Sequence, residues 1–370
     1  MILLSQIEPL KTYNKNRLAC RLEKMKEIKK ILLLVLLLAV INPLSGFAGG
    51  SLEKQNKTNK YSKKLDAIGE QITLTLAHGM NPKHPVAVGM RFFAKRVNEL
   101  SNNKIRINIF PNGQLGNEVD LTQQVQLGCI DMTKTSASAM ESFVEDFSVL
   151  SLPYLFSDEG HYWQILRGPI GQSILDSGKA VGLQGITFYD AGARSFYTRN
   201  KPILKPKDLK GMKIRTQGSP TAIAMIKVMG GSPTPIPYGS LYTALQEGVV
   251  DGAENNVPSL YSSRQFETVK YYALDEHTRT PDVLMISKIV WKKLPEVARN
   301  IILEAAEESL DFQIDLWKKE SKEDLIKIEK SGVKVLKVDK KPFQDKVKPM
   351  YDKYKGTRIG KLINKIKKAE

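Results

Sequence analysis

Apolar and polar residues alternate with two different periods along the chain from residue 71 onwards. In 71–78 and 104–110 every second residue is apolar, which predicts half-buried β-strands. Across 84–101 apolar residues recur at three- and four-residue intervals, which predicts a helix with one buried face. The alternation continues with helical patterns over 118–127, 219–229 and 240–247 and strand-like runs in ITFYDAG, KIRTQG and VVDGAEN. Strands that alternate with helices predict an α/β fold, in which ligands bind at the ends of strands.

A much longer helical pattern begins at Pro295, continues to about Lys330 and is ended by Gly332. At 1.5 Å per residue this helix is roughly 54 Å long. That length exceeds the width of one small domain, and a chain of 370 residues is long enough for two domains. We therefore expect a two-domain α/β protein in which one long helix spans both domains.

The N-terminal region carries the features of an export signal. Its only long apolar run, 31–41, is shorter than the about 20 residues that a membrane span needs. Three lysines precede this run within 25–30, and Pro43 and small residues follow it. This layout predicts a signal peptide that is cleaved after Ala48. The alternative is an uncleaved N-terminal anchor.

The segments on either side of this signal are polar. Residues 1–24 do not belong to a signal peptide, so we expect translation to start at Met25. The segment 49–70 is rich in Lys, Asn and Ser, which predicts a flexible leader with a short helix near its end.

The strongly positive charge does not indicate a nucleic-acid-binding protein. The formal net charge is +17, but residues 1–48 contribute +5 and 340–370 contribute +8, which leaves +4 for 49–339. The sequence also lacks helix-turn-helix, zinc-finger and RNP patterns. We therefore expect no nucleic-acid partner and interpret 351–370 as a solvated basic tail. A weak attraction of this tail to anionic lipid is the alternative.

The sequence shows no motif for metal binding, cofactor binding or catalysis. Its four histidines are scattered, and it has no H-E-x-x-H, G-x-S-x-G, P-loop or G-x-G-x-x-G pattern. With 42% hydrophobic and 26% charged residues it has the composition of an ordinary globular protein. We expect a protein without metal or cofactor that is not an enzyme. Because catalytic residues that meet only in space leave no local motif, an exported sugar-acid enzyme stays an alternative.

Arginines and amides occur where several predicted strands end. Arg194 and Arg215 follow apolar runs, and Asn255 and Asn256 end the run VVDGAENN. Arg presents a fork of donors that matches the two oxygens of a carboxylate, and Asn both donates to and accepts from sugar hydroxyls. This combination predicts recognition of a small hydroxylated acid. The alternative for each arginine is a structural ion pair or a surface charge, and for Tyr238 a core position.

Several long motifs occur in order along 71–345, among them GQLGNEVDLTQQVQLGCIDMTKTSASAM, YDAGARSFYTRNKPILKPKDLKGMKIRTQ, PIPYGSLYTALQEGVVDGAENN and KYYALDEHTRTPDVLMIS. With these motifs the chain resembles the solute-binding proteins of TRAP transporters, the DctP family. The resemblance implies a periplasmic-binding-protein-like clamp of two α/β domains that closes by a hinge around an organic acid. It also implies delivery of that acid to the small and large membrane subunits of a transporter, with no covalent bond made or broken. We expect a monomer in the periplasm.

The resemblance also implies roles for individual residues. Arg215 matches an arginine that forms a paired salt bridge with the substrate carboxylate, and Arg194 matches a second, supporting arginine. Asn255 matches an amide on the carboxylate side, and Tyr238 an aromatic residue against the ligand. Ser240 stands where many members have Glu, and we expect it to cap the following helix. The other expected ligand-binding positions are Glu118, Lys134 and Ser136 at the far end of the ligand, and His84 and Gln217 by their place in loops.

The domain boundaries follow from the predicted elements and the resemblance. We expect a first domain of 71–191 with 281–320, a second of 192–280 with 321–350, and chain crossings near 191–192 and 280–281. The motifs DMTKTSAS and DGAENN resemble members that bind hexuronates or related sugar acids more than members that bind C4-dicarboxylates or sialic acid. A hexuronate is therefore the favoured ligand. A C4-dicarboxylate-binding protein and a ligand-sensing periplasmic protein stay alternatives.

Overall fold

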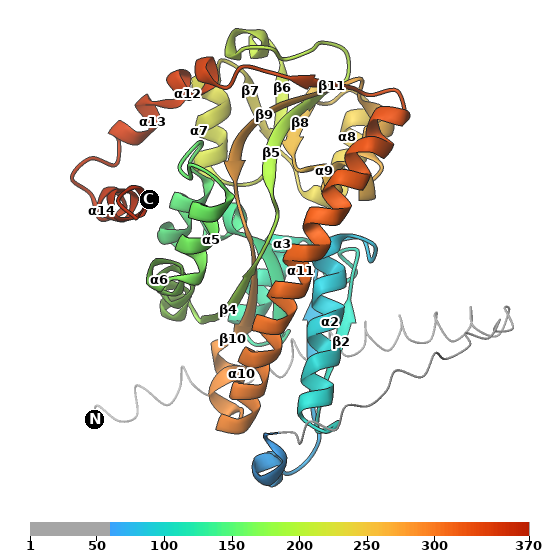
Figure 1. Cartoon of the computed structure of the whole chain (residues 1–370), viewed down its shortest axis with the longest axis vertical. Helices are drawn as coiled ribbons and strands as arrows, with labels where there is room; N and C mark the ends of the chain where they lie inside the picture. The colour runs from blue at the N-terminus through green and yellow to red at the C-terminus, as the bar shows by residue number, and fades with distance from the viewer. Residues whose placement is uncertain (1–59, 370) are drawn as a thin grey trace, which may run out of the picture.

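The computed structural model describes residues 60–369, which form two lobes, each built on its own β-sheet (Figure 1). The strands of the first lobe are, in spatial order, β2 (Ile105–Phe110), β1 (Ile72–Ala77), β3 (Met132–Ser136), β10 (Asp282–Ser287) and β4 (Leu183–Tyr189). β1 pairs in parallel with β2 and β3, and β10 pairs antiparallel with β3 and β4.

The second lobe has a six-stranded sheet. Its strands are, in spatial order, β11 (Lys334–Lys337), β9 (Tyr271–Arg279), β5 (Ala193–Thr198), β8 (Gly252–Asn255), β6 (Lys213–Thr216) and β7 (Ser232–Pro235). β5 lies antiparallel between β8 and β9, whereas β6 pairs in parallel with both β7 and β8.

Helices follow most of these strands, as the sequence periodicity predicted. Before β5 the chain forms η1 (Ser62–Ile68), α2 (Pro85–Leu100), α3 (Glu118–Gln126), α4 (Ala137–Met140), η2 (Glu145–Ser151), α5 (Glu159–Arg167), α6 (Pro169–Ser177) and η3 (Gly178–Val181). After β5 it forms η4 (Pro206–Leu209), α7 (Pro220–Met229), η5 (Tyr238–Ser240), α8 (Leu241–Gln246), α9 (Val257–Ser262), η6 (Gln265–Thr268) and α10 (Lys288–Lys293). The last helices are α11 (Glu296–Lys330), α12 (Lys341–Val347), α13 (Pro349–Asp352) and α14 (Arg358–Lys367).

The long helix α11 confirms the prediction of one helix that spans both lobes. It packs on α2 and β4 in the first lobe and on α9 in the second (Figure 1). The helix begins at Glu296, one residue after the predicted start at Pro295, which is its N-cap. The sequence pattern was informative here because a buried apolar stripe must recur at helical spacing over the whole length of such a helix.

The chain crosses between the two sheets at two short connections. β4 of the first sheet ends at Tyr189 and β5 of the second begins at Ala193, and β9 of the second sheet ends at Arg279, three residues before β10 of the first begins. Both crossings therefore consist of only a few residues, which limits how the lobes move relative to each other.

Helix α11 holds the first of these crossings. The side chain of Gln313 accepts a hydrogen bond from the backbone nitrogen of Asp190 (2.8 Å) and donates one to its carbonyl oxygen (2.9 Å). Gly192 lies next to the ring of Trp317 with φ +55°, and a Cβ at this position would lie 2.7 Å from Nε1 of Trp317. Only glycine fits both the left-handed backbone and this close approach.

Each lobe has two clusters of buried apolar side chains, and the C-terminal segment joins one in each lobe. Phe343 and Val347 of α12 pack in a second-lobe cluster, whereas Ile359, Ile363 and Ile366 of α14 pack in a first-lobe cluster. The expectation of a solvated basic tail therefore holds for only one side of α14. Its isoleucines at i, i+4 and i+7 form the buried face, and its lysines lie on the exposed face.

The N-terminal predictions fall mostly outside the described residues. The start at Met25, the signal peptide, its cleavage after Ala48 and the leader up to residue 59 cannot be compared with the structure, which begins at Lys60. The short helix expected near the end of the leader is η1, whose Leu65 and Ile68 are buried in the first lobe. Among residues 60–369, none of the helices has the length and apolar character that a membrane span requires.

Candidate functional site

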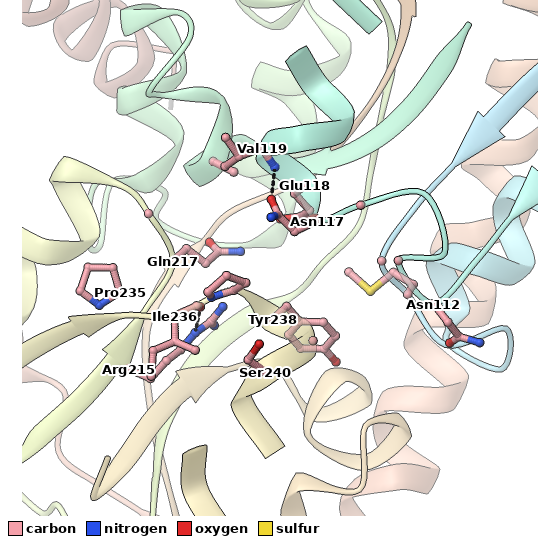
Figure 2. Close-up of a pocket in the computed structure, with 18 residues that line it drawn as sticks. Asn112, Asn117, Glu118, Val119, Arg215, Gln217, Pro235, Ile236, Tyr238 and Ser240 are labelled. Carbon is pink, nitrogen blue, oxygen red and sulfur yellow. Dashed lines mark hydrogen bonds between the residues drawn. The ribbon is translucent and has the colours of Figure 1, made fainter. Parts of the chain in front are cut away.

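A cavity of about 410 Å³ lies between the two lobes (Figure 2). The first lobe lines it with the loops before α3, the first turn of α3 and Ala139 of α4. The second lobe lines it with the ends of β6 and β7 and the turn η5. A smaller cavity of about 20 Å³ adjoins it. The two cavities share four lining residues, which are Met80, Glu118, Gln217 and Tyr238. They therefore form one cleft with a wide part and a narrow part.

Arg215, on β6, lines the wide part of the cleft and pairs with no carboxylate among residues 60–369. Its side chain is 2% exposed, and Nε donates to the carbonyl oxygen of Ile236 at 2.8 Å (Figure 2). Nη1 is buried without a hydrogen-bond partner among the residues that the structure describes. Burial lowers the pKa of this guanidinium, because water no longer stabilises its charge. A buried, uncompensated cation beside a cavity is relieved by an anion bound in that cavity.

Arg194, on β5, contrasts with Arg215 because its charge is paired inside the protein. Nε donates to Oε2 of Glu254 at 2.6 Å and Nη2 donates to Oε1 at 2.9 Å, which is a bidentate ion pair. Nη2 also donates to the backbone carbonyl oxygen of Glu254 at 2.8 Å, and Nη1 donates to Oδ1 of Asn255 at 2.7 Å. Arg194 therefore forms a buried ion pair within the second lobe, and it also lines the narrow part of the cleft.

This contact orients the amide of Asn255. Its Oδ1 accepts from Arg194 and from the backbone nitrogen of Asn256 (3.0 Å). Both donors approach the oxygen, so the amide NH₂ is directed away from them. Asn255 lines the narrow part of the cleft. Arg194 therefore fixes the amide oxygen of a residue that lines the cleft.

Two further buried groups, His277 and Asp275, lie next to Glu254. Nε2 of His277 lies 3.4 Å from Oε2 of Glu254, and Nδ1 lies 2.8 Å from Oδ2 of Asp275. Burial opposes the charge of His277, but the two carboxylates raise its pKa to about 9. Burial likewise opposes the charge of Glu254, but Arg194 and His277 lower its pKa to about 2. Asp275 thus contacts His277, His277 contacts Glu254, and Glu254 holds Arg194 in place.

Glu118 lies opposite Arg215, at the first-lobe side of the cleft (Figure 2). It is the first residue of α3, and Oε1 pairs with Nζ of Lys134 at 2.8 Å. Nζ also pairs with Oδ1 of Asp282 at 2.9 Å. Burial opposes the charge of Lys134, but Asp282 and Glu118 raise its pKa above the usual value. Glu118 is therefore held as an oriented carboxylate.

Tyr238, Gln217 and Ser136 complete the cleft. The ring of Tyr238 lines both parts, while its hydroxyl donates to the carbonyl oxygen of Ser259 at 3.2 Å. Oγ of Ser136 in the first lobe donates to Oε1 of Gln217 in the second at 3.3 Å. This hydrogen bond joins the two lobes at the narrow part of the cleft.

The sequence of this two-lobed chain matches a known protein family. A family model described as bacterial extracellular solute-binding protein, family 7 (DctP), matches residues 76–357. The chain belongs to this family. Its members are binding proteins and not enzymes, so the recognition from sequence motifs and the expectation of a non-enzymatic protein are both confirmed.

Solved structures of TRAP periplasmic solute-binding proteins match most of this DctP-family chain. One from Xanthobacter autotrophicus Py2, with bound β-D-galacturonate, is 38% identical with a TM-score of 0.78 and covers 80% of this chain and 100% of its own. One from Pseudomonas putida F1, with bound D-glucuronate, is 34% identical with a TM-score of 0.77 and covers 80% and 97%. One from Sulfurospirillum deleyianum, with bound succinate, is 30% identical with a TM-score of 0.77 and covers 81% and 100%.

Two residues that were expected to face the ligand line neither part of the cleft. Lys134 is fully buried and contacts the cleft through Glu118 and Asp282, which both line its narrow part. His84 is the N-cap of α2, where Nδ1 accepts from the backbone nitrogen of Val86, and Nε2 contacts Oγ of Ser259 at 3.1 Å. Burial lowers the pKa of His84 to about 3, so the ring is neutral and joins the lobes through an uncharged hydrogen bond.

One further expectation needs revision in this DctP-family protein, namely that Ser240 caps the helix that follows it. Ser240 occupies the N-cap position of α8, but its side chain makes no capping hydrogen bond and lines the cleft instead (Figure 2). Asn256 lines the narrow part, but Oδ1 accepts from the backbone nitrogen of Ser259 and caps α9. Both residues have short polar side chains, which serve equally well as a cap or as a surface group.

Sequence reasoning missed several residues that line or support the cleft. Met80, Asn112, Asn117 and Pro235 line it, and Glu254 and His277 support it. A local signal existed only for Asn117, whose Oδ1 caps α3 by accepting from the backbone nitrogens of residues 119 and 120. Among residues 60–369, no cluster of three or more His, Cys, Asp or Glu side chains has the arrangement of a metal site.

Proposed function

We propose that this protein captures a hexuronate or a related sugar acid in the periplasm and delivers it to the membrane subunits of a TRAP transporter. The observation that carries this proposal is the buried guanidinium of Arg215, which lacks an anionic partner and borders the cavity. A bound carboxylate supplies that partner. The export signal expected at the N-terminus is consistent with this location.

The carboxylate would accept hydrogen bonds from Arg215 and from the amide NH₂ of Asn255. Both donors come from the second lobe, from the neighbouring strands β6 and β8. Arg194 contributes by fixing the orientation of Asn255, and its own donors stay on Glu254 and Asn255. In this assignment Arg215 is the ligand-binding arginine and Arg194 is the supporting one.

Glu118 favours a sugar acid over a dicarboxylate. Its carboxylate accepts hydrogen bonds from hydroxyl groups, whereas it repels a second carboxylate at the same end of the cleft. The amide of Gln217 and the hydroxyl of Ser240 add polar groups that suit a hydroxylated ring. The galacturonate- and glucuronate-bound relatives support this class of ligand. The succinate-bound relative keeps a C4-dicarboxylate as the second candidate.

Closure of the two lobes around the ligand would combine these contacts. We propose that 71–191 with 281–320 and 192–280 with 321–350 move as two bodies about the crossings at 190–192 and 280–281. The first body supplies Glu118, and the second supplies Arg215 and Asn255. Because each lobe holds only half of these groups, the ligand stabilises the closed arrangement over an open one.

Titration calorimetry with glucuronate, galacturonate and succinate tests the proposed ligand class. We expect the two hexuronates to bind at least about tenfold more tightly than succinate, which corresponds to about 1.4 kcal/mol. Glu118→Gln removes the negative charge and is expected to narrow this ratio. Binding of succinate alone would overturn the hexuronate assignment and favour the dicarboxylate. If chromatography shows that the protein converts the sugar acid into a product, the protein is instead an enzyme.

A further inference from the structure

Glu141 of the first lobe reaches across to helix α7 of the second lobe. It is the C-cap of α4, directly after the cleft-lining segment that contains Ala139. Its carboxylate accepts from Oγ of Ser219 at 2.5 Å, from the backbone nitrogen of Thr221 at 3.1 Å and from Oγ1 of Thr221 at 2.7 Å. Ser219 and Thr221 are both fully buried. No other first-lobe carboxylate among residues 60–369 makes such a set of contacts with α7.

The chemistry of this contact is favourable for both partners. Thr221 belongs to the first turn of α7, where backbone N–H groups lack a partner within the helix. The helix dipole also favours a negative charge at this end. Hydrogen bonds from neutral donors to a carboxylate are stronger than bonds between neutral groups. Separating the lobes would break all of them together.

The contact lies beside the ligand-binding segment of the second lobe. Ser219 is two residues from Gln217, which lines the cleft, and four residues from Arg215. Next to it, Oγ of Ser142 donates to the carbonyl oxygen of Gly218 at 3.0 Å. Residues of the first lobe therefore bond both to hydrogen-bond donors and to acceptors within 217–221. Glu141 itself lines neither part of the cleft.

We propose that Glu141 is a positioning residue for ligand binding, which holds the closed lobes together through the N-terminus of α7 without touching the ligand. This inference rests on the proposed function only in requiring that the cleft closes around a ligand. The contact forms after the ligand has entered, so it controls how long the ligand stays and not how fast it arrives.

Stopped-flow kinetics of binding tests this inference with a graded set of variants. The probe is the acid that the wild-type protein binds most tightly among glucuronate, galacturonate and succinate. We expect Glu141→Ala to raise the dissociation rate constant about tenfold while the association rate constant changes by less than twofold. Glu141→Gln keeps an acceptor but not the charge, so we expect an intermediate increase.

Thr221→Val provides the partner variant, because it removes one donor with little change of shape. Combined with Glu141→Ala it should add almost nothing, since both changes remove the same contact. The control is Glu145→Ala, a nearby residue of the first lobe whose side chain is 69% exposed and pairs with the exposed Arg358. We expect it to leave both rate constants unchanged.

Two results overturn the inference. One is an unchanged dissociation rate constant in Glu141→Ala, and the other is an equal loss of thermal stability with and without ligand, which would mark Glu141 as a purely structural residue. The outcome is independent of the ligand class. If only succinate binds and Glu141→Ala still shortens its residence, the hexuronate proposal fails and the role of Glu141 stands.

Discussion

Arg194 and Arg215 lie on β5 and β6, the two strands that flank β8, but only Arg194 is paired with a carboxylate of that strand. Glu254 points to the β5 side, where both of its oxygens bond to Arg194. Arg215, on the other side, donates to the backbone carbonyl of Ile236 and to no carboxylate within the described part of the chain. This difference in pairing is the basis for proposing Arg215 as the arginine that binds the carboxylate of the ligand and Arg194 as the supporting one.

Removal of the carboxylate of Glu254 should be costly because it leaves Arg194 buried and unpaired. We expect Glu254→Gln to lower the free energy of unfolding by about 3 to 5 kcal/mol. Denaturant unfolding at neutral pH measures this change. Glu267→Gln is the matched control, since Glu267 pairs with an Arg264 whose side chain is 74% exposed, and it should cost less than about 1 kcal/mol. Equal effects of the two substitutions would contradict the structural role of Glu254.

The stability of the protein should fall at mildly alkaline pH because of His277. Its pKa is raised from 6.5 to about 9 by the two neighbouring carboxylates, against the effect of burial. The stabilisation is complete below pH 6.5 and is lost as the pH rises through about 9, where the folded protein gives up this proton. Unfolding free energies measured from pH 6.5 to 10 should decrease for the wild type. His277→Gln cannot titrate there, so a slope as steep as that of the wild type would disprove this origin.

The crossing at Gly192 should not tolerate a side chain. Gly192→Ala places a Cβ 2.7 Å from Trp317 in a backbone conformation with φ +55°. We expect a loss of about 2 to 3 kcal/mol in unfolding free energy from strain and overlap together. Gly211→Ala separates the two causes, since φ is +80° there but nothing lies within 4 Å of the added Cβ. It should cost only about 1 kcal/mol. A similar loss of unfolding free energy for both variants would mean that Trp317 moves aside to make room for the added methyl group.

Much of the fold could be predicted because its elements bury one face over several turns or residues. The alternation in 71–78 and the helical pattern in 84–101 correspond to β1 and α2. The strand β3 shows where this reasoning ends. Lys134 and Ser136 lie on the same face of it, and every residue of β3 is buried. Periodicity gives the face of a residue but not its depth, so only the structure shows that Lys134 lies beneath Glu118.

The candidate site could be predicted only in part for a similar reason. The arginine in KIRT is marked by its position near a strand end, but the carboxylate that neutralises Arg194 and not Arg215 comes from another strand, β8. The C-terminal tail gives a second example. Its many lysines favour a solvated tail, but Ile359, Ile363 and Ile366 have the spacing of a buried helix face. The lysines indicate that one face of α14 is exposed to solvent, and the spacing of the isoleucines indicates that the opposite face is buried.

The most direct test of the account is the dissociation constant of Arg215→Ala for the hexuronate that the wild-type protein binds most tightly, measured by titration calorimetry. The account predicts an increase of at least about 30-fold, corresponding to about 2 to 3 kcal/mol, because the ligand carboxylate loses its charged partner. Arg264→Ala, at an exposed position, should bind like the wild type. A folded Arg215→Ala protein with near-normal affinity would contradict the central claim that this guanidinium holds the ligand.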